Sequence, residues 1–331
     1  MDFILIFDKK ENMVHFKSIF LFFALLTTTL NYGQFTDVIN SNRPGESMGG
    51  FSVGKTVFQA ELGFYGIKEK HEFLDYEADG FGSELSLRYG ALLEQLEFNL
   101  DLQYQKDWYN SDVLNETRSG LKQTTIGVKY LFYDPNKKPE GKPNVYSWKA
   151  NHRFSYKSLI PAVGLYAGAH INISDNPFSF PNEPTISPKA MLITQNQFGK
   201  QVLVINIIAD KIATDYFSYG YIITLTRGFS PRWSGFLENQ GIKGDYYSDG
   251  IFRGGAAFLI KENIQVDASI GANYKNTPSL LFGGIGLSWR FDKNYSEIML
   301  RTPKEKKGKD KKGKDKKDKT KKRLDEVDQE K

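Results

Sequence analysis

The chain has 331 residues, of which 44 are Lys or Arg, 39 are Asp or Glu and none is Cys. Without Cys it has no disulfide framework, no thiolate zinc site and no Cys nucleophile. Membrane-spanning helices need about 20 apolar residues each, and the only long apolar run, residues 19–30, is too short. Abundant Gly (30 residues) and aromatic residues (14%) are typical of many short strands and turns.

Residues 1–33 are predicted to be a secretory signal peptide. A basic start at Met13–Lys17 precedes an apolar core of about a dozen residues, and small Gly33 precedes the expected cleavage. The mature chain then begins at Gln34. Met13 is the alternative translation start, because residues 1–12 fit no part of a signal peptide.

Residues 34–50 are predicted to be an N-terminal segment that leads into a barrel and partly fills its lumen. Gly49–Thr56 matches the phosphate-loop pattern, and Gly45–Gly49 matches the nucleophile elbow of hydrolases. Both motifs need a strand before them and a helix after them, whereas a polar stretch precedes and an alternating stretch follows. We therefore expect no catalytic residue and no cofactor site, and the protein is not expected to be an enzyme.

Metal binding is not expected either. The four histidines lack metal-ligand spacing; they are His15, His71, His152 and His170.

Residues 51–292 alternate between apolar and polar in segments of roughly ten residues, each closed by turn residues. In one segment Leu96, Phe98 and Leu100 share a face, opposite Glu97 and Asn99. A soluble sandwich shows the same alternation. The export signal and the full charges on the polar faces favour an all-β fold, an antiparallel transmembrane outer-membrane β-barrel whose apolar face meets lipid.

About twelve strands are expected, an even number as in bacterial single-chain barrels. Their ranges are 51–66, 80–89, 94–107, 119–133, 158–174, 187–198, 201–212, 217–228, 231–241, 249–260, 263–274 and 280–292. With both termini periplasmic, the short connections fall on the periplasmic side and the longer ones outside. Residues 134–157 break this rule, and an unassigned hairpin or an error in register there would change the count by two.

Ten charged residues are predicted to face the lumen. They either line a solute path and set its selectivity, or form ion pairs that fill the interior; the structural role is favoured, and the two can coexist. We expect Glu61, Arg88, Asp267 and Arg290 to form the core of this network. The full set is Glu61, Glu84, Arg88, Glu97, Asp101, Lys129, Glu238, Arg253, Asp267 and Arg290.

Residues 293–331 are predicted to be a disordered, Lys-rich tail, because the repeated KKGKD sequence cannot bury apolar surface. Residues 301–331 carry 15 basic and 8 acidic groups, against 26 and 28 in residues 34–300. The expected partners are outer-membrane lipid, lipopolysaccharide or another anionic envelope partner that binds residues 304–323. Nucleic acid is disfavoured, because no aromatic residues are interleaved with the lysines.

Several short motifs resemble the outer-membrane barrel family named for the meta pathway of phenol degradation, which is grouped with the long-chain fatty-acid transporter barrels. The opening motifs are Asn42–Gly45, Phe51–Lys55, Phe58–Gly63 and Leu87–Gly90, and the closing ones are Asn263–Asp267, Ser269–Gly271 and Gly284–Phe291. The resemblance spans residues 41–291, and its composition is typical of a Bacteroidetes member.

The resemblance implies a channel or transporter-like barrel in a Gram-negative outer membrane. Its expected role is the passive uptake of small compounds, with aromatic or hydrophobic ones as candidates; no single substrate is named. The alternative is a closed structural or accessory barrel that anchors a periplasmic or envelope partner through its basic tail.

Overall fold

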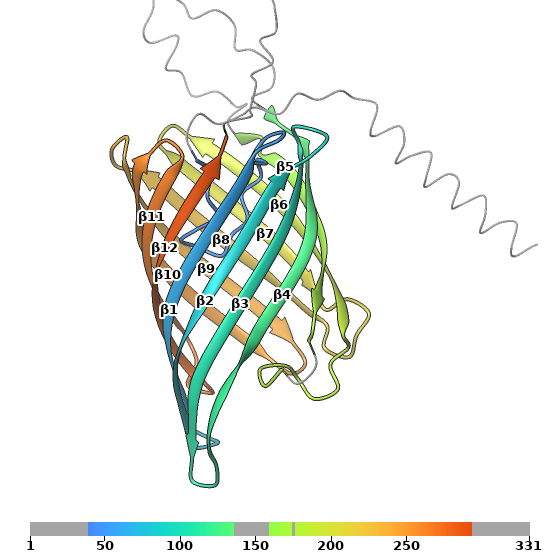
Figure 1. Cartoon of the computed structure of the whole chain (residues 1–331), viewed down its shortest axis with the longest axis vertical. Helices are drawn as coiled ribbons and strands as arrows, with labels where there is room; N and C mark the ends of the chain where they lie inside the picture. Colours follow the sequence, from blue (N-terminus) through green and yellow to red (C-terminus); the bar gives the residue numbers. More distant parts are fainter. Residues whose placement is uncertain (1–38, 136–158, 174–175, 293–331) are drawn as a thin grey trace, which may run out of the picture. The chain divides into compact units, whose positions relative to one another are not determined.

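The computed structural model describes residues 39–135, 159–173 and 176–292. Within these residues, twelve antiparallel strands close into a barrel in simple sequence order (Figure 1), as predicted. The strands are β1 Phe58–His71, β2 Tyr76–Gly90, β3 Leu96–Ser111, β4 Asn115–Tyr133, β5 Ala162–Ile171, β6 Ile186–Phe198, β7 Gln201–Asp210, β8 Ser218–Gly228, β9 Trp233–Gly244, β10 Ser248–Lys261, β11 Ile264–Asn273 and β12 Ser279–Phe291.

The barrel closes through the pairing of β1 with β12, in which Phe58 lies opposite Phe291 and Lys70 opposite Ser279. Every strand therefore has two neighbours, and no edge is left unpaired. β4 pairs directly with β5, so no additional hairpin is inserted into the wall between them. The strand ends at Phe58 and Phe291 lie at one end of the barrel, here called the terminal rim; the opposite end is the distal rim.

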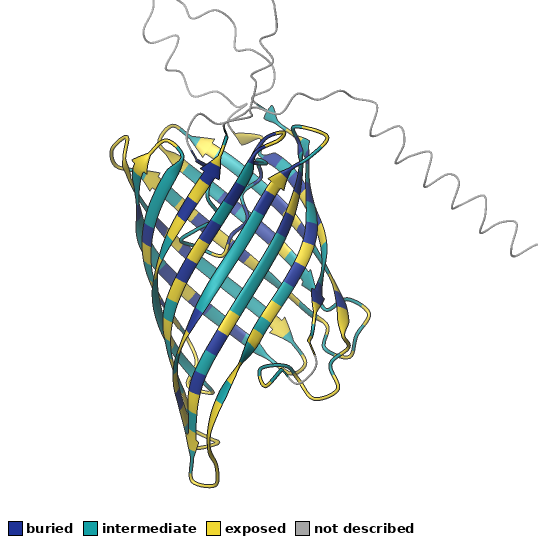
Figure 2. Cartoon of the chain, viewed as in Figure 1, coloured by how far each residue is buried: buried dark blue, intermediate teal, exposed yellow. Residues whose placement is uncertain are grey.

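Successive side chains alternate between the lumen and the outer surface, because strand side chains have a period of two. Arg88 is fully buried, whereas the neighbouring Tyr89 is 45% exposed. Figure 2 shows this banding along the strands. Outward aromatic residues gather at the terminal rim, where Trp289 and Phe291 pack at 4.0 Å between ring centroids. An apolar exterior with an aromatic girdle and a polar interior is the pattern of outer-membrane barrels.

The first strand begins at Phe58 and not at residue 51 as predicted. Residues 51–57 turn because Gly54 and Thr56 adopt positive φ angles of 96° and 63°. In addition, Lys129 donates hydrogen bonds to the carbonyl oxygens of Gly49 and Phe51. This stretch continues the preceding segment, and we call residues 39–57 the luminal segment.

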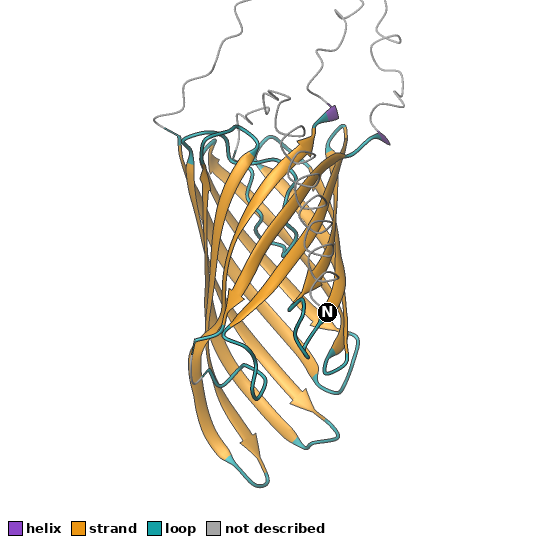
Figure 3. Ribbon diagram, turned by 90° about the vertical axis from the view of Figure 1, so that its right-hand side faces the viewer, coloured by secondary structure: helices purple, strands orange, loops and turns teal. Residues whose placement is uncertain are grey.

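Two connections expected to be long are short. Residues 67–79 and 108–118 belong mostly to strands, and the connections shrink to residues 72–75 and 112–114. The hairpins of β1–β2 and β3–β4 protrude at the distal rim (Figures 1 and 3). Both of their faces carry polar residues, so the alternation that marks a strand in lipid is weak in the sequence. Cross-strand contacts such as Lys70 to Glu77 at 2.6 Å hold them together.

Several predicted segments lie wholly or largely outside the described residues: the signal peptide at 1–33, most of the connection at 134–157 and the tail at 293–331. Among the residues that the structure does describe, no helix is long and apolar enough to cross a membrane.

Candidate functional site

The luminal segment enters the barrel at the terminal rim, runs into the lumen and returns to the same rim (Figure 3). At its start, the Ile39 amide donates to the Glu262 carbonyl at 2.7 Å. At its end, the Gly90 amide donates to the Val57 carbonyl at 3.0 Å. Gly90 is needed there, because a Cβ at this position would lie 1.7 Å from the Gly54 carbonyl oxygen. The segment is therefore anchored at both of its ends.

Inside the lumen, side chains of the wall bind the backbone of the segment. Asn206 on β7 accepts a hydrogen bond from the Met48 amide at 2.7 Å and donates one to the Met48 carbonyl at 3.0 Å. Glu238 on β9 accepts from the amides of Glu46 and Ser47 at 3.1 and 3.2 Å. Similar bonds come from Glu61, Glu97, Lys129 and Gln195 on β1, β3, β4 and β6. These bonds satisfy backbone groups that would otherwise be buried without partners.

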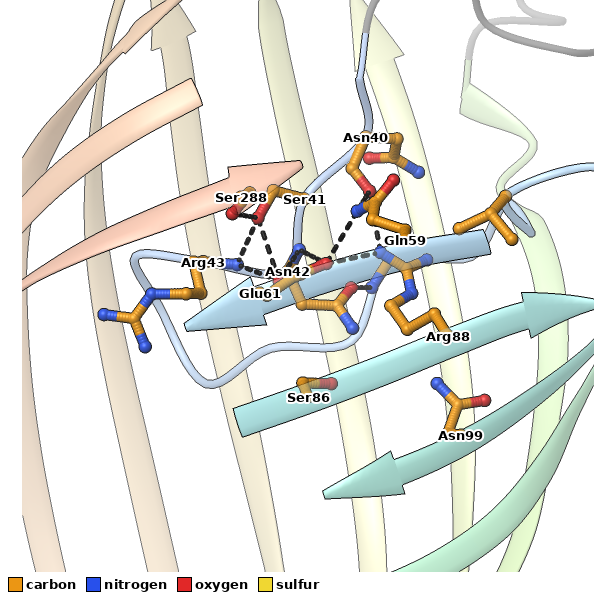
Figure 4. A network of polar contacts seen from close by, with 12 residues as sticks. Asn40, Ser41, Asn42, Arg43, Gln59, Glu61, Ser86, Arg88, Asn99 and Ser288 are labelled. Carbon is orange, nitrogen blue, oxygen red and sulfur yellow. Dashed lines mark hydrogen bonds and ion pairs between the residues drawn. The ribbon is translucent and has the colours of Figure 1, made fainter. Parts of the chain in front are cut away.

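A buried ion-pair network lies beside the segment near the terminal rim (Figure 4). The Arg88 guanidinium contacts Glu61 at 3.0 Å and binds both carboxylate oxygens of Glu97 at 2.9 and 3.0 Å. Lys129 pairs with Glu97 at 3.1 Å, and all four side chains have zero exposure. Arg88 also donates to the Asn40 carbonyl at 2.7 Å. The network therefore couples four wall strands, β1 to β4, to the luminal segment.

The segment contributes its own cation to the wall. Arg43 pairs with Glu84 on β2 at 2.8 Å and with Asp267 on β11 at 3.4 Å. Glycines make room for its guanidinium, because a Cβ at Gly63 or Gly286 would lie 2.3 Å from it. Arg43 thus bridges two strands on opposite sides of the β1–β12 seam.

The ten predicted luminal charges all lie on inward-facing positions, but they pair differently from what was expected. Of the expected core, Glu61 and Arg88 contact each other, whereas Asp267 pairs with Arg43 and Arg290 with Asp292. Register places Gln59 opposite both Arg88 and Arg290 and places Asp267 opposite Gly286, so that Glu61 with Arg88, and Asp267 with Arg43, form separate ion pairs. The remaining pairs are Glu97 with Arg88 and Lys129, Glu84 with Arg43, and Glu238 with Arg253, while Asp101 accepts from Ser86.

Sequence reasoning missed Arg43, Gln195 and Asn206 as contacts of the luminal segment. Asn206 had a readable signal, because it is the single amide within the apolar stretch from Val202 to Ile208 and falls on its inward face. The sequence signal for Arg43 was weaker, because its position in a polar segment does not show which carboxylates it pairs with.

Two cavities flank the luminal segment. One, of about 240 Å³, lies toward the terminal rim and includes Ser234 and Gln265 in its wall. The other, of about 170 Å³, lies toward the distal rim and includes Gln103 and Lys189; we call it the distal cavity. Both are lined by Asn42, Arg43 and Gly45. This part of the segment therefore stands between the two halves of the lumen.

The motifs that look catalytic do not adopt catalytic contexts. Both glycine-rich patterns lie in the luminal segment, which leads into strand β1 and not into a helix. Across the described ranges, no group of three or more His, Cys, Asp or Glu side chains could hold a metal ion. His170, on β5, bridges Thr125 at 2.7 Å and Asp210 at 2.6 Å, and it ties β4, β5 and β7 together.

An all-antiparallel barrel with an apolar exterior, a charged interior and an inserted N-terminal segment defines an outer-membrane-type β-barrel. The chain belongs to the family described as "Putative MetA-pathway of phenol degradation", whose profile matches residues 41–291. This confirms the resemblance seen in the sequence motifs. No curated protein matches the chain.

Solved structures of similar fold include an outer-membrane channel from Pseudomonas putida F1. It is 11% identical, with a TM-score of 0.51, and the match covers 76% of this chain and 100% of that one. The translocator domain of the autotransporter NalP from Neisseria meningitidis is 8% identical, with a TM-score of 0.44 and coverage of 85% and 98%. The CymD monoaromatic hydrocarbon channel is 9% identical, with a TM-score of 0.39 and coverage of 72% and 89%. The likeness to the Pseudomonas channel shows a shared fold.

Proposed function

We propose that the protein is a channel in the outer membrane of a Gram-negative bacterium, through which small compounds enter by passive uptake. The observation that carries this proposal is the closed barrel with a cavity on each side of the luminal segment. A structural barrel needs no such space along its axis. The family's description adds support for aromatic or hydrophobic compounds as candidate solutes.

The orientation follows from how such barrels are built. Bacterial barrels have an even number of strands with both ends periplasmic, so the terminal rim faces the periplasm and the protruding hairpins face outward. The export signal predicted at residues 1–33 delivers the chain to that membrane.

The luminal segment sets the width of the path. A solute that moves from the distal cavity to the periplasm passes residues 42–45, where the backbone is bonded to Glu61 and the Arg43 side chain is bonded to Glu84 and Asp267. Most wall charges are paired with opposite charges. The wall therefore presents polar groups with little net charge of its own.

The test is planar-bilayer conductance combined with liposome swelling, for three purified chains. They are the mature chain from Gln34, the same chain without residues 34–50, and the same chain without residues 303–331. We expect conductance and swelling from the mature chain, a larger conductance from the chain without residues 34–50, and no change from the chain without residues 303–331. The absence of both conductance and liposome swelling in all three chains would refute the channel function.

A closed accessory barrel that anchors an envelope partner through the basic tail is the second candidate. Hydrogen bonds and ion pairs tie the luminal segment to β1, β2, β3, β4, β6, β7, β9 and β11, and they favour this candidate because they oppose opening. The same three chains separate the candidates. Loss of a co-purifying partner on deletion of residues 303–331, with no solute flux in any chain, supports the anchor.

A further inference from the structure

Most charges that face the lumen, among the described residues, have an opposite charge or a hydrogen-bond partner within contact distance. Asp107 pairs with Arg118 at 2.9 Å, in addition to the pairs around Arg43, Arg88 and Arg253, and the Asp210 carboxylate lies 2.6 Å from the His170 Nε2 atom. Unmatched charges in such a lumen are therefore conspicuous. They are the groups that remain available to a solute.

Two unmatched charges of opposite sign line the distal cavity. They are Glu46, an exposed residue of the luminal segment, and Lys189 on β6. Among the described residues, neither side chain has a hydrogen bond or an ion pair. Asp101 also lines this cavity, with Ser86 as its hydrogen-bond donor at 2.5 Å. The cavity thus presents available negative and positive groups together.

The size and the remaining walls of the cavity define the solute further. Its volume of about 170 Å³ is the space of roughly five or six water molecules, which suits a small molecule. Met48 and Met191 form an apolar part of the lining and are 8% and 6% exposed. Methionine side chains adapt their shape to irregular apolar groups.

We propose that the distal cavity binds a small zwitterionic solute, whose anionic group is held by Lys189 and whose cationic group is held by Glu46. An apolar body of the solute packs on Met48 and Met191. A purely anionic solute meets the carboxylates of Glu46 and Asp101, and a purely cationic solute meets the Lys189 ammonium. A molecule with both charges avoids both repulsions. This inference rests on the proposed channel function, because the cavity lies on the proposed path.

The test uses three probes with one apolar body: leucine, 4-methylpentanoate, which lacks the ammonium, and 3-methylbutylamine, which lacks the carboxylate. Binding to the purified full chain in detergent is measured by titration calorimetry at neutral pH. We expect leucine to bind about tenfold more tightly than either of the other probes, as one charge-assisted hydrogen bond provides.

Substitutions then assign each contact. Lys189→Gln is expected to lower the affinity for leucine to that of 3-methylbutylamine for the unsubstituted chain. Glu46→Gln is expected to lower it to that of 4-methylpentanoate. Lys200→Gln and Glu262→Gln remove the same charges in connections at the terminal rim and are expected to change nothing. The shift in gel mobility on heating confirms that each variant is a folded barrel.

The outcomes separate this inference from the channel function. Three results would overturn binding of a zwitterion at the distal cavity, even where the mature chain conducts. They are equal binding of the three probes, no binding of leucine, and leucine binding that neither Lys189→Gln nor Glu46→Gln weakens. If leucine binding depends on both residues but the chain neither conducts nor causes liposome swelling, the binding site is supported and the channel function is refuted.

Discussion

Replacing Arg88 by Met tests how much the buried network contributes to the barrel. Arg88 is fully buried and contacts Glu61, Glu97 and the Asn40 carbonyl. Methionine occupies similar space without a charge, so the substitution removes the central cation and leaves two buried carboxylates around it. Any loss of stability then reports on charge pairing and not on a cavity.

The expected loss is about 3 kcal/mol in the free energy of unfolding, the lower end of the range for removing one partner of a buried ion pair. The lower end applies because both carboxylates keep other partners. Glu97 retains Lys129 at 3.1 Å and Asn99 at 2.9 Å, and Glu61 retains the Ser41 hydroxyl at 2.9 Å. Adding Glu61→Gln to Arg88→Met is expected to cost less than the sum of the two single changes, because the residues interact directly.

The assay is urea unfolding of the refolded chain in detergent micelles, followed by Trp fluorescence. Arg232→Ala serves as the matched control, since Arg232 is exposed in the connection between β8 and β9. Exposed charges of this kind contribute at most about 1 kcal/mol. An Arg88→Met barrel whose unfolding free energy lies within about 0.5 kcal/mol of this control would contradict the reasoning.

Two further substitutions test how the luminal segment is held. Gly90→Ala is expected to destabilise the barrel by about 1–3 kcal/mol, because the added Cβ would lie 1.7 Å from the Gly54 carbonyl oxygen. Gly66→Ala is its control, because no atom lies closer than 3.9 Å to the added Cβ. Urea unfolding measures the loss of unfolding free energy in both variants, and equal losses would contradict the close contact between Gly90 and Gly54. Asn206→Leu is expected to cost about 2 kcal/mol or more, because both polar backbone groups of Met48 lose their partner, and to raise bilayer conductance. Asn239→Leu, on the outward side of β9, is its control, and unchanged conductance in both variants would show that this bond does not hold the segment in the path.

The architecture of the wall was predictable from local sequence. A strand that separates lipid from a polar lumen must alternate at every position, and this holds whichever strand lies beside it. Segments such as Leu96 to Gln105 therefore show their two faces directly. The closing motifs ahead of Phe291 and the short connection at Gly199 and Lys200 locate the strand ends for the same reason. The inward positions of all ten predicted charges follow from this alternation.

Local alternation failed where the surroundings of a strand change. The protruding ends of β1 and β2, such as Lys70 and Glu77, face water on both sides, so polarity no longer distinguishes their faces. The stretch from Phe51 to Val57 alternates like a strand, yet positive φ angles at Gly54 and Thr56 bend it into the lumen.

The pairing of the charges was decided only by the tertiary structure. The Glu46 amide and the Glu238 carboxylate that it binds are 192 residues apart, and Arg43 reaches Glu84 and Asp267 from different parts of the chain. The sequence by itself determined which side chains turn inward, because that depends on a period of two along each strand. Which of them meet, and where cavities remain between them, depends on strand register, barrel closure and the course of the luminal segment. These are set by contacts between residues far apart in the chain.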